Sequence, residues 1–263
     1  SGNFVTFFRG PFGDAKTFIQ ERIKETLKQN PWLVGRLHKT SQGHGIALRW
    51  SDESLQNELD AIDKDESSMF HLSPSDLNGK IQLDQPYEEL CRIVLKSSYV
   101  VPVGKICLKK NLPLFTVTMI PVDKDSFVVL TSVSHIPADG YTAYGILNML
   151  LSPDPNAVQS LDPKRDHSFN DKLTEAIGLQ EKSVLDFSLP GILNAIGKHL
   201  FLPRPKGFFF TLNMEAVEQE KARFREQSDQ PGAAYISTND ILCSTLSCMM
   251  QFSSLYMAVN FRR

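Results

Sequence analysis

The sequence predicts a mixed α/β fold, in which helices flank a mixed sheet. Two apolar runs at 114–122 and 127–134 are separated by the turn residues Asp-Lys-Asp, which predicts a β-hairpin. Apolar residues recur at helical spacing over 15–29. Over 128–151 an apolar strand reaches a sharp turn and continues as an apolar helix. Strands that alternate with amphipathic helices in this way are typical of the α/β class.

Composition limits the range of functions. The chain has 263 residues, of which 41% are apolar and 22% charged, and its net charge is -2. These values are typical of one large globular domain or two small ones, and they give no reason to expect a nucleic acid partner. The four cysteines include no CxxC pair, and the N-terminal residues do not resemble a signal peptide. We therefore expect a cytoplasmic, reducing location without disulfides.

The N-terminal elements follow from local patterns. Residues 4–8 predict a strand, and Asp14 is the expected N-cap of a helix that ends before Asn30-Pro31. After a strand at 45–50, the acidic stretch 52–66 predicts a solvated helix or loop, and 72–86 predicts irregular structure. Apolar residues on the inner helix face and in the corner that follows are expected to be buried: Phe18, Ile19, Ile23, Leu27, Trp32, Leu33, Val34 and Leu37.

The second half of the chain is divided by a polar crossover. We expect an N-terminal domain over 1–160, a crossover over 161–206, and a strand–helix–helix–strand segment over 207–263. The crossover contains an apolar segment, 187–202, for which docking on another domain is favoured over contact with a membrane. In the last segment the expected strands are 207–213 and 255–261. Its helices are 214–226, with Val217 and Phe224 facing inward, and 241–252, capped by 237–240.

His135, at the end of the second hairpin strand, is the candidate catalytic residue. A neutral imidazole can accept a proton near neutral pH and so deprotonate a hydroxyl, amine or thiol that attacks a carbonyl. Pro137 stiffens the turn after the strand, and Gly140 is expected to allow a backbone angle or a close approach that a side chain would prevent. Asp139 either orients the imidazole, as in a catalytic triad, or holds the turn. The turn-holding role is favoured because Asp before Gly often serves a turn.

The segment HIPADG at 135–140 resembles the HxxxDG signature of the CoA-dependent acyltransferase superfamily. Flanking segments resemble the plant-type BAHD members of this superfamily: NPWLVGRL at 30–37, STNDILCSTL at 237–246 and YMAVNFRR at 256–263. Ser134 stands where condensation domains usually have a second His, so the BAHD members are the more similar group.

The resemblance implies a specific fold and activity. It implies a chloramphenicol-acetyltransferase-like architecture of two similar α/β domains, with a channel that reaches the His from both sides. It implies that His135 is the general base, with Asp139 and Gly140 shaping its turn. Acyl-CoA would be the co-substrate and a small hydroxyl or amine compound the acceptor, with no permanently bound cofactor and no metal.

The chain departs from this family in one large respect. BAHD-like enzymes are much longer and carry a DFGWG motif in their second domain, which is absent from this sequence. We therefore expect this chain to be an N-terminal half and crossover, with the C-terminal domain supplied in cis or in trans. That domain is also expected to supply the oxyanion donor, often the largest catalytic contribution, so the chain alone is expected to be almost inactive.

Several other residues have simpler explanations. His38 and His44 lack the partners of a metal site. Lys105, Lys109 and Lys110 are more typical of a solvated face than of a CoA phosphate site. The alternative function is a non-catalytic binding or scaffold protein that retains half of an acyltransferase fold. A condensation domain is a weaker third possibility.

Overall fold

A computed structural model describes residues 1–40, 45–164, 168, 171–172, 174–175, 178, 213–227 and 236–250. The chain forms two compact units, Ser1–Asp186 and Phe187–Arg263. The boundary falls inside the predicted crossover, 161–206. The apolar segment 187–202 and the strand predicted at 255–261 lie outside the described residues, as does the strand predicted at 207–213 apart from Asn213.

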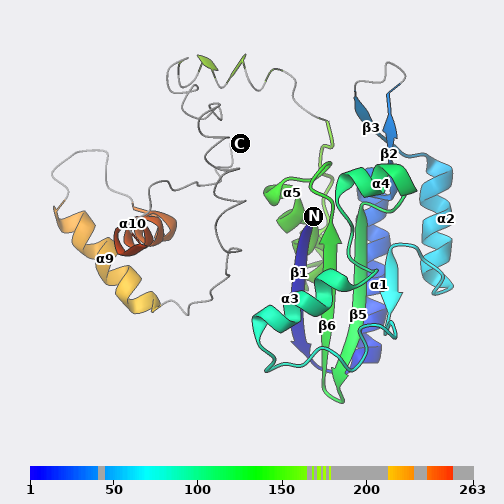
Figure 1. Cartoon of the computed structure of the whole chain (residues 1–263), viewed down its shortest axis with the longest axis horizontal. Helices are drawn as coiled ribbons and strands as arrows, with labels where there is room; N and C mark the ends of the chain where they lie inside the picture. The colour runs from blue at the N-terminus through cyan, green and yellow to red at the C-terminus, as the bar shows by residue number, and fades with distance from the viewer. Residues whose placement is uncertain are drawn as a thin grey trace, which may run out of the picture. The chain divides into compact units, whose positions relative to one another are not determined.

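The first unit is built on a four-stranded mixed sheet of order β1-β6-β5-β4 (Figure 1). Strand β4 is parallel to β5 and the other pairings are antiparallel. The strands are β1 (Gly2–Arg9), β4 (Phe70–Leu72), β5 (Phe115–Asp123) and β6 (Ser126–Val133). A separate two-stranded sheet pairs β2 (Arg36–Lys39) with β3 (Ile46–Arg49). The predicted mixed α/β class and the hairpin of β5 and β6 are confirmed.

Helices cover both faces of the sheet. One apolar core joins α1 (Phe12–Gln29), α2 (Asp52–Asp63) and α5 (Gly140–Leu151) to the face that carries Phe115, Val117 and Val129. On the other face, α3 (Tyr87–Lys96) buries Val94 against Val128 and Leu130. In Figure 1, α1 lies behind the strands and α3 crosses in front of them. The short helix α4 (Gly104–Lys110) packs beside β2.

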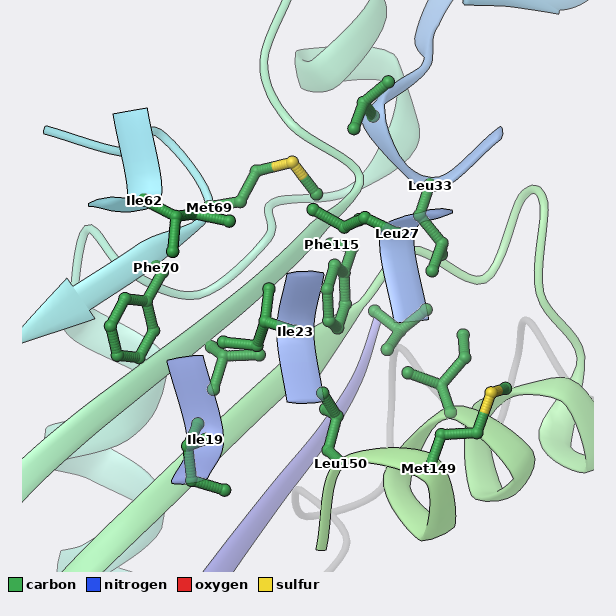
Figure 2. Packing of buried hydrophobic residues seen from close by; sticks show 14 of the residues in the cluster. Ile19, Ile23, Leu27, Leu33, Ile62, Met69, Phe70, Phe115, Met149 and Leu150 are labelled. Atoms are coloured by element: carbon green, nitrogen blue, oxygen red, sulfur yellow. The ribbon is translucent and has the colours of Figure 1, made fainter. Parts of the chain in front are cut away.

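Helix α1 contributes three buried apolar residues to the core on its side of the sheet. Ile19, Ile23 and Leu27 are buried, and Figure 2 shows Ile23 and Leu27 beside Phe115 of β5. Two predicted details are wrong. The N-cap is Pro11, and Asp14 lies in the first turn, where its charge interacts favourably with the helix dipole. Phe18 is 40% exposed, because its ring lies under the Arg22 guanidinium at 5.3 Å rather than in the core.

Polar groups of α1 and of its C-cap residue, Asn30, fasten the segment after α5 to the core. Arg22, which is 5% exposed, donates to the carbonyl oxygens of Ser152 at 3.0 Å and Pro155 at 3.3 Å. The buried Asn30 amide donates from Nδ2 to the carbonyl of Gln159 at 2.9 Å, and its Oδ1 accepts from the backbone N–H of Leu161 at 2.7 Å. These bonds fix the path of the chain as it enters the predicted crossover.

Replacing Asn30 by alanine is expected to lower the free energy of unfolding by about 2–4 kcal/mol, since it leaves the backbone groups of Gln159 and Leu161 without their buried partner. Urea unfolding measures the loss, and hydrogen exchange should show earlier opening at the Leu161 amide. Asn57→Ala, on the exposed face of α2, is the control and should change stability by less than about 0.5 kcal/mol. Equal effects of the two variants would contradict the fastening role.

The second unit contains two described helices in contact, α9 (Met214–Gln227) and α10 (Thr238–Met250). The predicted cap of α10 is confirmed: Ser237 Oγ accepts from the backbone N–H of Asp240 at 3.1 Å, and Asp240 Oδ2 accepts from the Ser237 N–H at 2.9 Å. Val217 is buried as predicted, whereas Phe224 is 36% exposed and the inward orientation predicted for it is wrong. Among the described residues, none of the helices combines the length and apolar character needed to cross a membrane.

Candidate active site

The backbone before His135 is held by β6, one of the two inner strands of the sheet. Val133, the last residue of β6, pairs with Gly2 of β1 on one side and with Phe115 of β5 on the other. The backbone N–H of the buried Ser134 then donates to the carbonyl of Leu114 at 2.7 Å. The backbone is therefore held by hydrogen bonds up to Ser134, so the residue that carries the imidazole ring follows directly on a fixed segment.

The turn that follows holds the His135 ring through one of its own carbonyls. His135 is exposed, and its Nδ1 lies 2.9 Å from the carbonyl oxygen of Ala138. A carbonyl oxygen only accepts hydrogen bonds, so Nδ1 must carry the proton. In the neutral ring, Nε2 is then the nitrogen with the free lone pair. An accessible imidazole in this tautomer has the form that a general base requires.

Asp139 holds the start of helix α5. Its Oδ1 accepts a hydrogen bond from the backbone N–H of Thr142 at 2.9 Å, and its own backbone is extended, as an N-cap residue requires. A hydrogen bond of this kind is what the turn-holding role predicted for Asp139 requires. His135 Nδ1 is hydrogen-bonded to the Ala138 carbonyl.

The structure does not support the predicted reason for Gly140. A Cβ at this position would meet no described atom within 4 Å, and the backbone does not have a positive φ. The described residues therefore place neither a special backbone angle nor a close contact at Gly140.

Gly140→Ala is expected to leave the fold intact and to raise stability by up to about 1 kcal/mol, because alanine loses less conformational entropy at the start of a helix. Thermal unfolding tests this. A thermal unfolding midpoint below that of wild type would contradict the open space found around a Cβ at position 140. Loss of acyl transfer in a variant of normal stability would place the need for glycine in the complex with substrate.

Sequence reasoning missed the part that α4 plays in the site. Gly104, its first residue, faces Ile136, the residue directly after His135. A Cβ on Gly104 would overlap Cδ1 of Ile136 and lie 2.8 Å from its Cγ1. No motif signals this contact, because Gly104 is 32 positions from Ile136 along the chain and meets it only in the folded structure.

Helix α4 carries one thiol, Cys107, whose surroundings disfavour the reactive thiolate. Burial raises the pKa of the Cys107 thiol, which donates to the carbonyl of Pro102 at 3.3 Å, so the sulfur stays protonated at neutral pH. Lys105, Lys109 and Lys110 on the same helix are exposed. Within the described residues, no three His, Cys, Asp or Glu side chains are placed to hold a metal ion. His38 is exposed on β2, and His44 lies outside the described residues.

A separate hollow of about 280 Å³ lies beside β4, and His135 does not line it. Burial lowers the pKa of His71 in this hollow, and its ring meets Tyr99 edge to face at 4.6 Å. The lining residues are Asp65, Phe70, His71, Leu72, Pro74 and Tyr99.

Comparison with known proteins finds similarity in structure alone. No protein-family model and no curated protein matches the sequence. The chain is similar to F. graminearum TRI101 complexed with ethyl coenzyme A, with 11% identity and a TM-score of 0.47 over 93% of this chain and 55% of that chain. It is also similar to F. sporotrichioides TRI101 complexed with coenzyme A and T-2, with 12% identity and a TM-score of 0.45 over 93% of this chain and 53% of that chain. The starter condensation domain of rhizomide synthetase RzmA matches with 13% identity and a TM-score of 0.36 over 88% of this chain and 43% of that chain. The chain spans about half, or less, of the length of these structures, so its function has to be argued from the site.

Proposed function

We propose that this chain is part of an acyl-CoA-dependent acyltransferase in which His135 is the general base. The proposal rests on one observation: the imidazole of an HIPADG segment is exposed at the end of the inner strand β6, with Nδ1 bonded to the Ala138 carbonyl and Nε2 left to accept a proton. The BAHD-like assignment and the chloramphenicol-acetyltransferase-like architecture are part of the same proposal, since they follow from the resemblance of the motif and its flanking segments.

The proposed reaction needs few groups from this chain. His135 Nε2 takes the proton of an acceptor hydroxyl or amine while the acceptor oxygen or nitrogen bonds to the thioester carbonyl carbon. The tetrahedral intermediate then collapses, the carbon–sulfur bond breaks, and the leaving CoA sulfur takes a proton from the imidazolium. Asp139 contributes by holding the start of α5, and Ala138 by holding the ring. The oxyanion donor is proposed to come from a C-terminal domain, in cis or in trans.

Mass spectrometry of the reaction products is the first test. The protein is incubated with acetyl-CoA and a mixture of hydroxyl and amine acceptors, once as the 263-residue chain and once with its C-terminal domain supplied. The proposal expects an acylated acceptor and free CoA thiol in the second case and very little in the first. Robust turnover by the chain alone would show that the missing donor is not needed. No product in either case, over a broad acceptor set, would favour the scaffold alternative.

A further inference from the structure

Helix α4 and the turn at His135 are joined to the same strand end. Cys107 of α4 is buried in a small apolar cluster with Leu37, Val101 and Leu114. The Leu114 carbonyl is the acceptor for the N–H of Ser134, directly before His135. This cluster fixes α4 relative to the point where the site begins, so the helix can serve as a support for the turn.

Ile136 contacts this support through Gly104. The Ile136 side chain is 48% exposed, and its Cδ1 occupies the space that a Cβ of residue 104 would fill. The other described glycines in the first turn of a helix, Gly13 and Gly140, have no atom within 4 Å of such a Cβ. Among these three, only Gly104 is therefore needed for the approach of another side chain.

We propose that Gly104 is a positioning residue for His135, a role that rests on the proposed function. Because Gly104 has no side chain, the Ile136 side chain can pack against its backbone; we call this contact the seat of Ile136. Ile136 packed in this way holds the turn in the conformation in which His135 Nδ1 donates to the Ala138 carbonyl. An exposed ring on a short turn can adopt several conformations. In those without the bond to Ala138 the proton is not held on Nδ1, so a smaller fraction of the protein has Nε2 available to accept a proton.

The tautomer of neutral His135, read from long-range ¹H–¹⁵N correlation spectra of the whole chain, tests the seat directly. The expected wild-type form carries the proton on Nδ1. Gly104→Ala should shift the ring toward a mixture that includes the Nε2–H form. Gly13→Ala, a matched change in the first turn of α1, should leave the spectrum as in wild type. A Gly104→Ala spectrum identical to that of Gly13→Ala would overturn the proposal, because Ile136 would then only have rotated into solvent.

A second variant covers the case in which Gly104→Ala fails to fold. Ile136→Ala adds no atoms and should shift the tautomer in the same direction. The double variant should match Ile136→Ala, because the seat and its occupant act as one unit. A wild-type tautomer in the Ile136→Ala variant, or an additive effect in the double variant, would also overturn the proposal.

Kinetics separates this proposal from the proposed function. With the C-terminal domain supplied, Gly104→Ala should lower kcat by about 10- to 100-fold while KM for acyl-CoA stays the same, because the base is misplaced and binding is not. Higher KM with unchanged kcat would contradict a positioning role. If neither the wild-type protein nor any variant transfers acyl groups, the proposed function fails. The tautomer measurement still decides whether Gly104 positions the ring.

Discussion

Replacing His135 by alanine is expected to lower acyl transfer by about 10²–10⁴-fold, the usual contribution of a general base. The variant keeps the backbone of the turn but loses the imidazole nitrogen that takes the proton from the hydroxyl or amine substrate. Because His135 is exposed, its removal leaves no buried cavity, and the thermal unfolding midpoint should stay close to that of wild type. Activity and stability should therefore separate in this variant.

His38→Ala is the matched control for this change. His38 is also exposed, but it lies on β2 in the small second sheet, and its loss should leave the rate of acyl transfer near the wild-type value. The measurement is release of CoA thiol from acetyl-CoA in the presence of an acceptor and of the proposed C-terminal domain. Near-wild-type turnover by a folded His135→Ala protein would refute the assignment of the base.

Replacing Phe115 by alanine is expected to lower the free energy of unfolding by about 3–5 kcal/mol. Phe115 is fully buried, and Figure 2 shows its ring beside Ile23 and Leu27 of α1. Truncation removes apolar contacts and leaves a cavity between the sheet and α1. Phe115 also pairs with Val133, two residues before His135, so this loss of packing occurs at the strand end that carries the site.

Urea unfolding followed by tryptophan fluorescence measures this loss, since Trp32 lies in the same core. Phe18→Ala is the control: Phe18 is 40% exposed and contacts the Arg22 guanidinium, so its truncation should cost less than about 1 kcal/mol. Similar losses in the two variants would contradict the packing described for β5. A loss of activity in Phe115→Ala that follows the unfolded fraction would identify its role as structural.

The elements with a long, clear period could be predicted from the sequence. The hairpin of β5 and β6 shows in two apolar runs around a polar turn, and α1 shows in its stripe of Ile19, Ile23 and Leu27. The Ser237 cap was also predictable, because its side chain bonds to the backbone three residues away. In each of these elements the deciding interactions are local or repeat along a face.

The elements that tertiary contacts decide could not be predicted. β4 has three residues and forms only by pairing in parallel with the distant β5, and β2 has four residues that read as part of a buried corner. Helix α4 starts at a glycine, which favours other structures, and its cluster with Leu37 and Leu114 stabilises it. The apolar spacing along α1 predicts Phe18 as a core residue, but its ring packs against the Arg22 guanidinium.

The candidate site divides in the same way. The HIPADG segment identified His135 as the base candidate and Asp139 as a turn residue. The tautomer of His135 depends on the carbonyl of Ala138, and its support on Gly104, which is distant in sequence. Backbone acceptors and close approaches of this kind carry no residue signature, so they emerge only from coordinates.

Chemical rescue of the His135→Ala variant by imidazole tests the central claim most directly. Because the ring it replaces is exposed, free imidazole can reach the vacated position and take the acceptor proton in its place. The rate of acyl transfer should rise with the concentration of neutral imidazole and fall as the added base is protonated. A rate that ignores imidazole, or that follows the imidazolium form, would contradict His135 as the general base.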